Sequence, residues 1–201
     1  MEQIAYFDNA ATTFPKPECV YTFADDFYRS NGANIGRSGH SLAQSASLME
    51  QECKTKLINL LECPNKQAIF TSSATEALNR ILLGLATSAN TSIYFSPFEH
   101  NAITRVAHHL KNTKGCKLTL LPFDPITLEF NSEVCEELFC NNRPDILVIT
   151  HASNVCGAIF PIKEITSLAK KFGAITIVDM SQSAGIVPCN ISSDNIDFAV
   201  F

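Results

Sequence analysis

The sequence predicts an α/β protein in which helices cover both faces of a mainly parallel sheet, in a three-layer α/β/α arrangement. Short apolar runs such as residues 146–150 and 174–179 have the composition of strands that are buried on both faces. Longer segments with helical periodicity lie between these runs. Regular alternation of strands and helices is typical of a parallel sheet, whose ligands bind at the carboxyl ends of the strands.

The expected elements follow one another along the chain. The N-terminal part holds two helices, at 17–30 and 41–62, with Pro17 suited to the first turn and a loop rich in Gly and Asn at 31–40. Strands are expected at 68–71, 93–95, 117–123, 146–150, 174–179 and 197–201. Helices are expected at 75–86, 101–111, 132–140 and 162–172, with Gly173 ending the last one. No repeat or charge run divides the chain, which predicts one compact unit.

Composition and charge narrow the class of protein. The 201 residues are 46% hydrophobic and 17% charged, as in ordinary globular proteins. A formal net charge of −5 disfavours a nucleic-acid or anionic-membrane partner. No apolar stretch is long enough to span a bilayer, and the first residues lack the pattern of a signal peptide. A cytoplasmic location is therefore expected.

The eight cysteines show no Cys-x-x-Cys pair and no histidine at zinc-finger spacing. This pattern predicts reduced thiols and no metal site. The cysteines are Cys19, Cys53, Cys63, Cys116, Cys135, Cys140, Cys156 and Cys189.

Asp179 is an acid at the end of an apolar strand. A buried carboxylate is costly unless a cation or a strong donor meets it, so Asp179 could hold a positive charge on a ligand. It could equally cap the turn that follows the strand.

Three other strand ends carry polar groups. The hydroxyl-rich segment 71–77 opens a helix and could hold a phosphate, or it could serve only as an N-cap through Ser73 or Thr75. His100 could stack on a flat ligand or move protons, or it could be a surface imidazole. Asn154 offers an amide, although loop asparagines often serve turns. Four such strand ends in succession indicate a ligand site.

These segments together resemble the class V, fold-type I pyridoxal-phosphate enzymes, and most closely the cysteine desulfurase and selenocysteine lyase group. The resemblance runs in order over essentially all 201 residues. It is carried by residues 6–13 (Tyr-Phe-Asp-Asn-Ala-Ala-Thr-Thr), Asn34 with Arg37 and His40, residues 73–77, 99–101 and 151–157, and Asp179 with Gln182.

The resemblance implies pyridoxal 5′-phosphate as the cofactor and assigns roles to these residues. Asp179 would pair with the pyridine nitrogen and keep the ring an electron sink. His100 would be the catalytic residue that stacks over the ring, and Ala74 and Thr75 would hold the phosphate. Asn154 and Gln182 would bond near the phenolic oxygen. The implied substrate-binding residues, on a wall that a second subunit could share, are Asn9, Ala10, Ala11, Asn34, Arg37 and His40.

The family's Schiff-base lysine is expected about four residues beyond Phe201, by the family's own spacing. The resemblance therefore predicts that residues 1–201 are the N-terminal segment plus most of the cofactor-binding large domain, incomplete at the C-terminus and without the small C-terminal domain. Lys163, Lys170 and Lys171 are expected to face solvent on a helix, where none of them could replace that lysine.

The function that the resemblance implies is removal of sulfur from L-cysteine, giving alanine and an enzyme persulfide. Expected partners are the amino-acid substrate, a sulfur-acceptor protein and a second copy of the full-length chain. Two alternatives stay open. One is another class V reaction, such as selenocysteine lysis or transamination, and the other is an inactive truncated product, since the 201 residues alone would lack the lysine.

Overall fold

Five parallel strands lie at the centre of the C-terminal part of the chain in the computed structural model, which describes residues 5–36 and 39–201. The strands are β1 (Ser92–Phe95), β2 (Lys117–Leu120), β3 (Ile146–Thr150), β4 (Ile175–Asp179) and β5 (Phe198–Val200). Their order across the sheet is β2-β1-β3-β4-β5, and every pair is parallel. All five strands therefore end at one side of the sheet, which we call the carboxyl edge.

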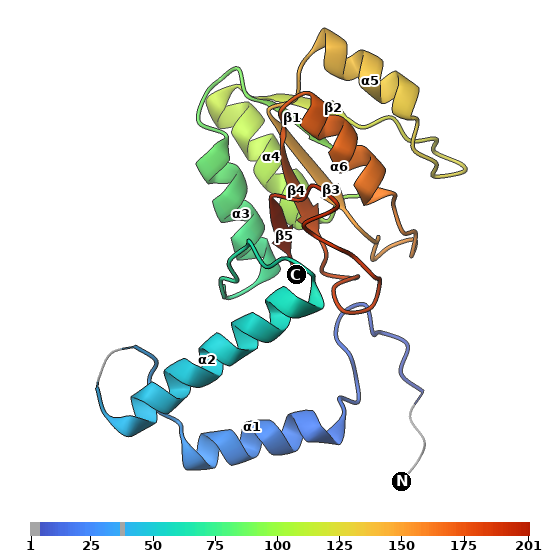
Figure 1. The fold of residues 1–201 in the computed structure, drawn as a ribbon. Helices are drawn as coiled ribbons and strands as arrows, with labels where there is room; N and C mark the ends of the chain where they lie inside the picture. The colour runs from blue at the N-terminus through green and yellow to red at the C-terminus, as the bar shows by residue number, and fades with distance from the viewer. Residues whose placement is uncertain (1–4, 37–38) are drawn as a thin grey trace. The chain divides into compact units, whose positions relative to one another are not determined.

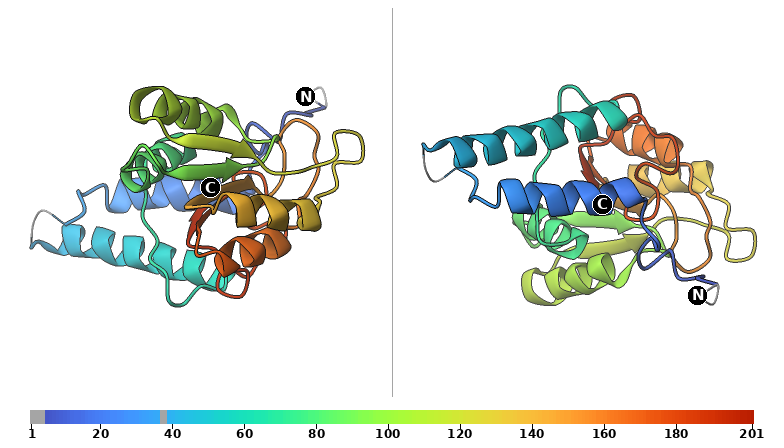
Figure 2. Two further views of the ribbon diagram at one scale, coloured as in Figure 1. Left: turned by 90° about the horizontal axis from the view of Figure 1, so that it is seen from above. Right: turned by 90° about the horizontal axis from the view of Figure 1, so that it is seen from below.

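Helices cover both faces of this sheet, as Figures 1 and 2 show. Helices α3 (Ala74–Leu85) and α4 (Asn101–Lys114) lie on one face. Helices α5 (Ser132–Asn141) and α6 (Ile162–Lys171) lie on the other. The predicted three-layer α/β fold is confirmed.

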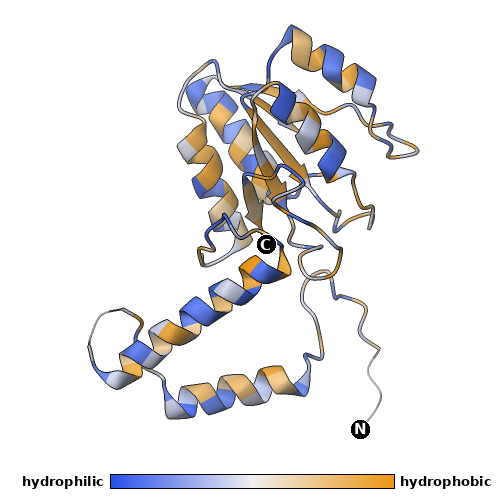
Figure 3. Ribbon diagram, in the orientation of Figure 1, coloured by the Kyte–Doolittle hydropathy of each residue, from blue (hydrophilic) through white to orange (hydrophobic). Residues whose placement is uncertain are grey.

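The core follows from the alternation of side chains along each buried strand. Ile93 and Phe95 of β1 pack with Ile146 and Val148 of β3 against the α3 and α4 face. Tyr94, between them, contacts Phe139 of α5, with ring centroids 4.9 Å apart. Strands β1 and β3 are buried at every position, and the central strands are largely hydrophobic in Figure 3, because both of their faces are covered.

The chain changes direction between β1 and β3. From β1 it passes through α4 to β2 at one edge, and from β3 it passes through α6 to β4 on the opposite side. The two connections leave the sheet over opposite faces, which makes the β1/β3 boundary a topological switch point.

The chain forms two compact units, Met1–Ile58 and Asn59–Phe201, so the expectation of one compact unit is wrong. The first unit holds α1 (Glu18–Ser30) and most of α2 (Ser41–Leu60). Helix α1 buries no residue, and α2 buries only Ala43 and Ala46. Neither helix thus buries a large side chain. No helix among the described residues has the length and apolar character needed to cross a membrane.

Two predicted strands differ from the structure. Residues 68–71 form no strand among the described residues, and Ile69 is 79% exposed. The run has residue types that favour a strand, but it pairs with none of the five strands of the sheet. A β-strand needs backbone hydrogen bonds to a neighbouring strand. The strand expected at 117–123 ends at Leu120, after which Phe123 bridges Phe130 in a separate turn. The remaining expected helices and strands are found within a few residues of their predicted bounds.

Gly173, which follows α6, adopts a left-handed φ of +77°, as the predicted helix stop requires. We expect Gly173→Ala to destabilise the fold by about 1–2 kcal/mol, because L residues are strained in this region. A Cβ there would also meet Arg143 Nη2 at 2.5 Å. The measurement is the free energy of unfolding from urea titration.

Gly84→Ala is the matched control for this change. Gly84 lies inside α3, where an added Cβ meets nothing within 4 Å. Alanine should stabilise this helix by about 0.5–1 kcal/mol. If both variants shift the stability in the same direction, the assignment of Gly173 as a conformationally required stop is wrong.

Candidate functional site

The carboxyl edge also carries the starts of two helices. Helix α3 runs back toward the beginning of β1, and α4 runs from the end of β1 toward the beginning of β2, so both helices begin at this edge. Ala102, in the first turn of α4, belongs to the buried core cluster, and Ala74, in the first turn of α3, packs against that cluster. The predicted phosphate segment, His100 and Asp179 therefore belong to the same end of the sheet.

Asp179 ends β4 and is 5% exposed. Its backbone lies opposite Thr150 of β3, and its carbonyl accepts a hydrogen bond from His151 N at 2.8 Å. Its Oδ1 accepts from Ser181 N at 3.0 Å and from Ser181 Oγ at 2.6 Å. The predicted turn-capping role is thus present, and it uses one of the two carboxylate oxygens.

The start of α3 is capped as the simpler interpretation predicted. Ser73 Oγ accepts a hydrogen bond from Glu76 N at 3.1 Å, so Ser73, and not Thr75, is the N-cap. The N–H groups of Ala74 and Thr75 point out of the first turn, where a helix offers no acceptor of its own. Glu76 bonds to Ser72, and this contact lowers the pKa of Glu76. The turn can present N–H groups and hydroxyls to an anion.

His100 is the N-cap of α4 and is exposed. Its Nδ1 accepts a hydrogen bond from Ala102 N at 3.2 Å. The neutral ring therefore carries its proton on Nε2, because the acceptor nitrogen has none. The contact fixes the ring at the carboxyl edge.

Glu99, beside His100, is a residue whose role the sequence did not reveal. Its Oε1 accepts from Ser96 Oγ and from Thr150 N, the latter at 2.8 Å. Its Oε2 is fully enclosed and has no hydrogen-bond partner among the described residues. Burial raises the pKa of Glu99 to about 7, and the nearby Asp179 carboxylate adds to this effect. The only available signal was an acid directly before a histidine at a strand end.

Asn154 lies exposed in the loop after β3. Ser153 shapes this loop: its Oγ accepts from Val155 N at 3.2 Å and from Cys156 N at 3.4 Å. Gly157 closes the turn with a φ of +69° and an N–H bond to Ser153 O. Gln182 lies half-buried in the turn after β4. Both predicted amides thus follow neighbouring strands at the carboxyl edge.

The predicted substrate-binding residues belong to the unit Met1–Ile58. Asn9 Oδ1 accepts from Phe14 N at 3.4 Å, and His40 Nδ1 accepts from Ala43 N at the start of α2 at 3.2 Å. Ala10, Ala11 and Asn34 are exposed. Arg37 lies outside the described residues.

Lys170 does not face solvent freely, contrary to expectation. Its ammonium bonds to Asp197 and to Ala174 O, so it tethers α6 to the chain before β5. Lys163 is exposed and lies 3.5 Å from Asp194. Lys170 is therefore occupied by a structural ion pair.

None of the eight cysteines, all of which the structure describes, forms a disulfide, as expected. Burial raises the pKa of Cys135 and of Cys189 to about 12, which makes both poor nucleophiles. Cys156 differs, because a hydrogen bond with the Ser153 hydroxyl lowers its thiol pKa. It lies exposed beside Asn154.

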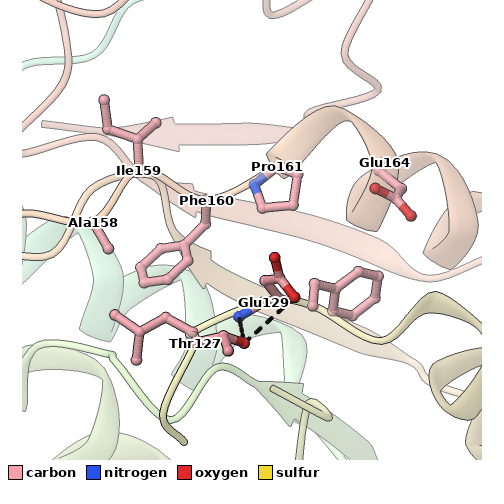
Figure 4. A pocket seen from close by; sticks show the side chains of 9 residues that line it. Thr127, Glu129, Ala158, Ile159, Phe160, Pro161 and Glu164 are labelled. Atoms are coloured by element: carbon pink, nitrogen blue, oxygen red, sulfur yellow. Dashed lines mark hydrogen bonds between the residues drawn. The ribbon is translucent and has the colours of Figure 1, made fainter. Parts of the chain in front are cut away.

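A cavity of about 470 Å³ lies between the loops that follow β2 and β3 (Figure 4). None of the predicted site residues that the structure describes lines it. Its polar side chains are Thr127, Glu129 and Glu164, of which Thr127 and Glu129 bond to each other. The lining residues are Thr127, Leu128, Glu129, Phe130, Ala158, Ile159, Phe160, Pro161 and Glu164.

With this geometry in place, comparison with known proteins defines the class of protein. The family model for aminotransferase class V matches residues 5–201. The chain belongs to this family. Within it, the chain is similar to cysteine desulfurases.

A probable cysteine desulfurase of Pyrococcus abyssi is 29% identical over 100% of this chain and 49% of its own length. One from Xylella fastidiosa (strain 9a5c) is 32% identical over 97% of this chain and 47% of its own. The apo structure of cysteine desulfurase from Thermococcus onnurineus NA1 superposes with a TM-score of 0.88 at 28% identity, covering 96% of this chain and 48% of that one. The chain spans about half the length of the curated relatives it matches.

Glu99 should give the fold a measurable pH dependence. Its pKa is near 4.5 when unfolded and about 7 when folded, so the folded state holds a proton that the unfolded state releases between these values. The stabilising contribution is full below pH 4.5 and is lost as the pH rises to about 7. At about 1.4 kcal/mol for each pKa unit, the loss is roughly 3 kcal/mol.

Glu99→Gln removes the titrating group and keeps an acceptor oxygen. Urea titrations from pH 4 to 8 should show the wild-type chain losing stability relative to this variant over that interval. Glu137→Gln, an exposed change on α5, is the control for the lost carboxylate. Parallel stability curves for wild type and Glu99→Gln would contradict the raised pKa.

Proposed function

We propose that the chain forms the cofactor-binding part of a pyridoxal-phosphate enzyme that removes sulfur from L-cysteine. The observation that carries this proposal is Asp179, an acid buried at the end of a parallel strand whose Oδ1 accepts from Ser181 at the carboxyl edge. A buried anion of this kind suits a protonated ring nitrogen, which is a desolvated cation with a single N–H donor. Family membership supports the same cofactor.

The donor set around the carboxyl edge fits pyridoxal phosphate. Asp179 would accept from the pyridine nitrogen, and the first turn of α3, at Ala74 and Thr75, would receive the phosphate. His100 would lie against the ring. Asn154 and Gln182 would bond near the phenolic oxygen. The bound cofactor would supply an electron sink for charge that develops at the substrate carbon.

The substrate side belongs to the N-terminal unit in this proposal. Asn9, Ala10, Ala11, Asn34, Arg37 and His40 would form the wall of the substrate entry, and a second subunit could share it. Residues 1–201 would be the N-terminal segment and most of the large domain of a homodimer. The similarity to cysteine desulfurases over about half their length supports this division.

We expect the reaction to take place in the cytoplasm, where a sulfur-acceptor protein would receive the sulfur. The lack of a disulfide among the eight described cysteines agrees with a reducing compartment.

The cofactor assignment is tested with pyridoxamine 5′-phosphate, which carries the ring, the phenol and the phosphate but no aldehyde to react with lysines. We expect Asp179→Asn to weaken its binding about tenfold, because the ring nitrogen loses a charged partner. The measurement is equilibrium dialysis of the 201-residue chain.

Asp145→Asn is the matched control. Asp145 accepts from Ser92 N at 2.8 Å at the opposite, amino end of the strands, so the variant loses the same charge away from the site. Equal affinities for wild type and Asp179→Asn would sink the cofactor assignment. The substrate assignment is tested separately, by cysteine-dependent alanine release from the longest gene product that contains residues 1–201; a cofactor-loaded protein that releases none would contradict it.

A further inference from the structure

The β1/β3 boundary is the place where a parallel sheet of this kind opens. Ladder pairing between these strands ends at Phe95 and Val148, and the chain then leaves β1 and β3 over opposite faces. The N–H of Thr150, two residues beyond the last pair, points to the β1 side, where no residue of β1 pairs with it.

Glu99 closes the opening with its side chain. Its Oε1 accepts a hydrogen bond from the N–H of Thr150 at 2.8 Å, and the same oxygen accepts one from Ser96 Oγ. The carboxyl group thus extends the β1–β3 connection past the end of the ladder. Because Thr150 is paired with Asp179 in β4, the contact joins the ends of three strands in a row.

The residues on both sides of Glu99 are anchored as well. The Phe98 ring stacks on Phe160 with centroids 4.8 Å apart and meets Phe123 edge-on at 5.3 Å. On the other side, His100 Nδ1 accepts from Ala102 N. Three consecutive side chains therefore fix the short segment that carries the imidazole.

We propose that Glu99 is a positioning residue of the candidate site, which sets the place of the His100 ring relative to the Asp179 carboxylate by tying the end of β1 to the end of β3. The inference rests on the proposed function for its consequence, the binding of a pyridoxal-type ring between these two groups. The raised pKa of Glu99, about 7, means that the acid is largely protonated below that pH, while its Oε1 accepts both bonds. An amide oxygen in its place should therefore serve equally well.

The test compares Glu99→Gln, Glu99→Ala and the exposed control Glu137→Ala in the 201-residue chain. The first readout is the NMR signal of the His100 imidazole without any ligand, assigned by its loss in His100→Gln. His108 and His109, exposed on the same helix, are internal references. The second readout is the dissociation constant of pyridoxamine 5′-phosphate.

Glu99→Gln should match wild type in both readouts. Glu99→Ala should shift the His100 signal, leave those of His108 and His109 in place, and weaken binding about tenfold. A merely structural role would lower the stability of Glu99→Ala without moving either readout at temperatures where the chain stays folded. That result would overturn the proposal, as would a Glu99→Gln variant that behaves like Glu99→Ala.

If Glu99→Ala does not fold, Glu99→Asp replaces it, because its carboxyl group is one methylene too short to keep both bonds. A folded Glu99→Asp chain with wild-type readouts would overturn the proposal. Failure of the wild-type chain to bind the probe would instead count against the proposed function, and the His100 signal, which needs no cofactor, would then decide the role of Glu99.

Discussion

The pairing of β3 with β4 is the constraint on which the candidate site depends. Thr150 lies opposite Asp179, and His151 N bonds to the Asp179 carbonyl, so the two strands end level with one another. This register fixes where the acid stands, and the loops that carry Asn154 and Gln182 begin directly from it. A shift of one residue would turn Asp179 to the other face of the sheet.

The sequence predicts the sheet well because the residue composition of each short run is enough to indicate a strand. Runs such as 146–150 are apolar on both faces, and only a covered parallel strand has that composition in a chain with intervening helices. Helix starts are coded in the same way: Ser73 and Asn131 have the residue types of N-caps, and both act as caps. Since the ends of parallel strands share one edge, the grouping of Asp179, His100 and the α3 turn follows from the order of elements.

What the sequence does not predict depends on contacts between distant segments. The bond from Thr150 to Glu99 joins residues that are 51 positions apart, and no local pattern marks it. Lys170 has the spacing of a solvent-facing residue, but Asp197 lies close enough to hold it. Residues 68–71 show the converse, since they have strand composition without a neighbouring strand. The roles of the site residues toward a ligand remain predictions, because residue types alone allow capping and binding together.

Capping and binding need not exclude each other at this edge. Ser181 occupies one oxygen of Asp179, and Ser73 occupies the third N–H of α3, so each local contact fixes a group without using all of its hydrogen-bonding capacity. Glu99 also combines two roles. Its Oε1 accepts the hydrogen bond of the Thr150 N–H, while burial disfavours a second negative charge beside Asp179. Below about pH 7 the protonated Glu99 beside Asp179 keeps the local negative charge low without removing an acceptor. The site can therefore present a single negative group to a cationic ring while its neighbours hold the strands in place.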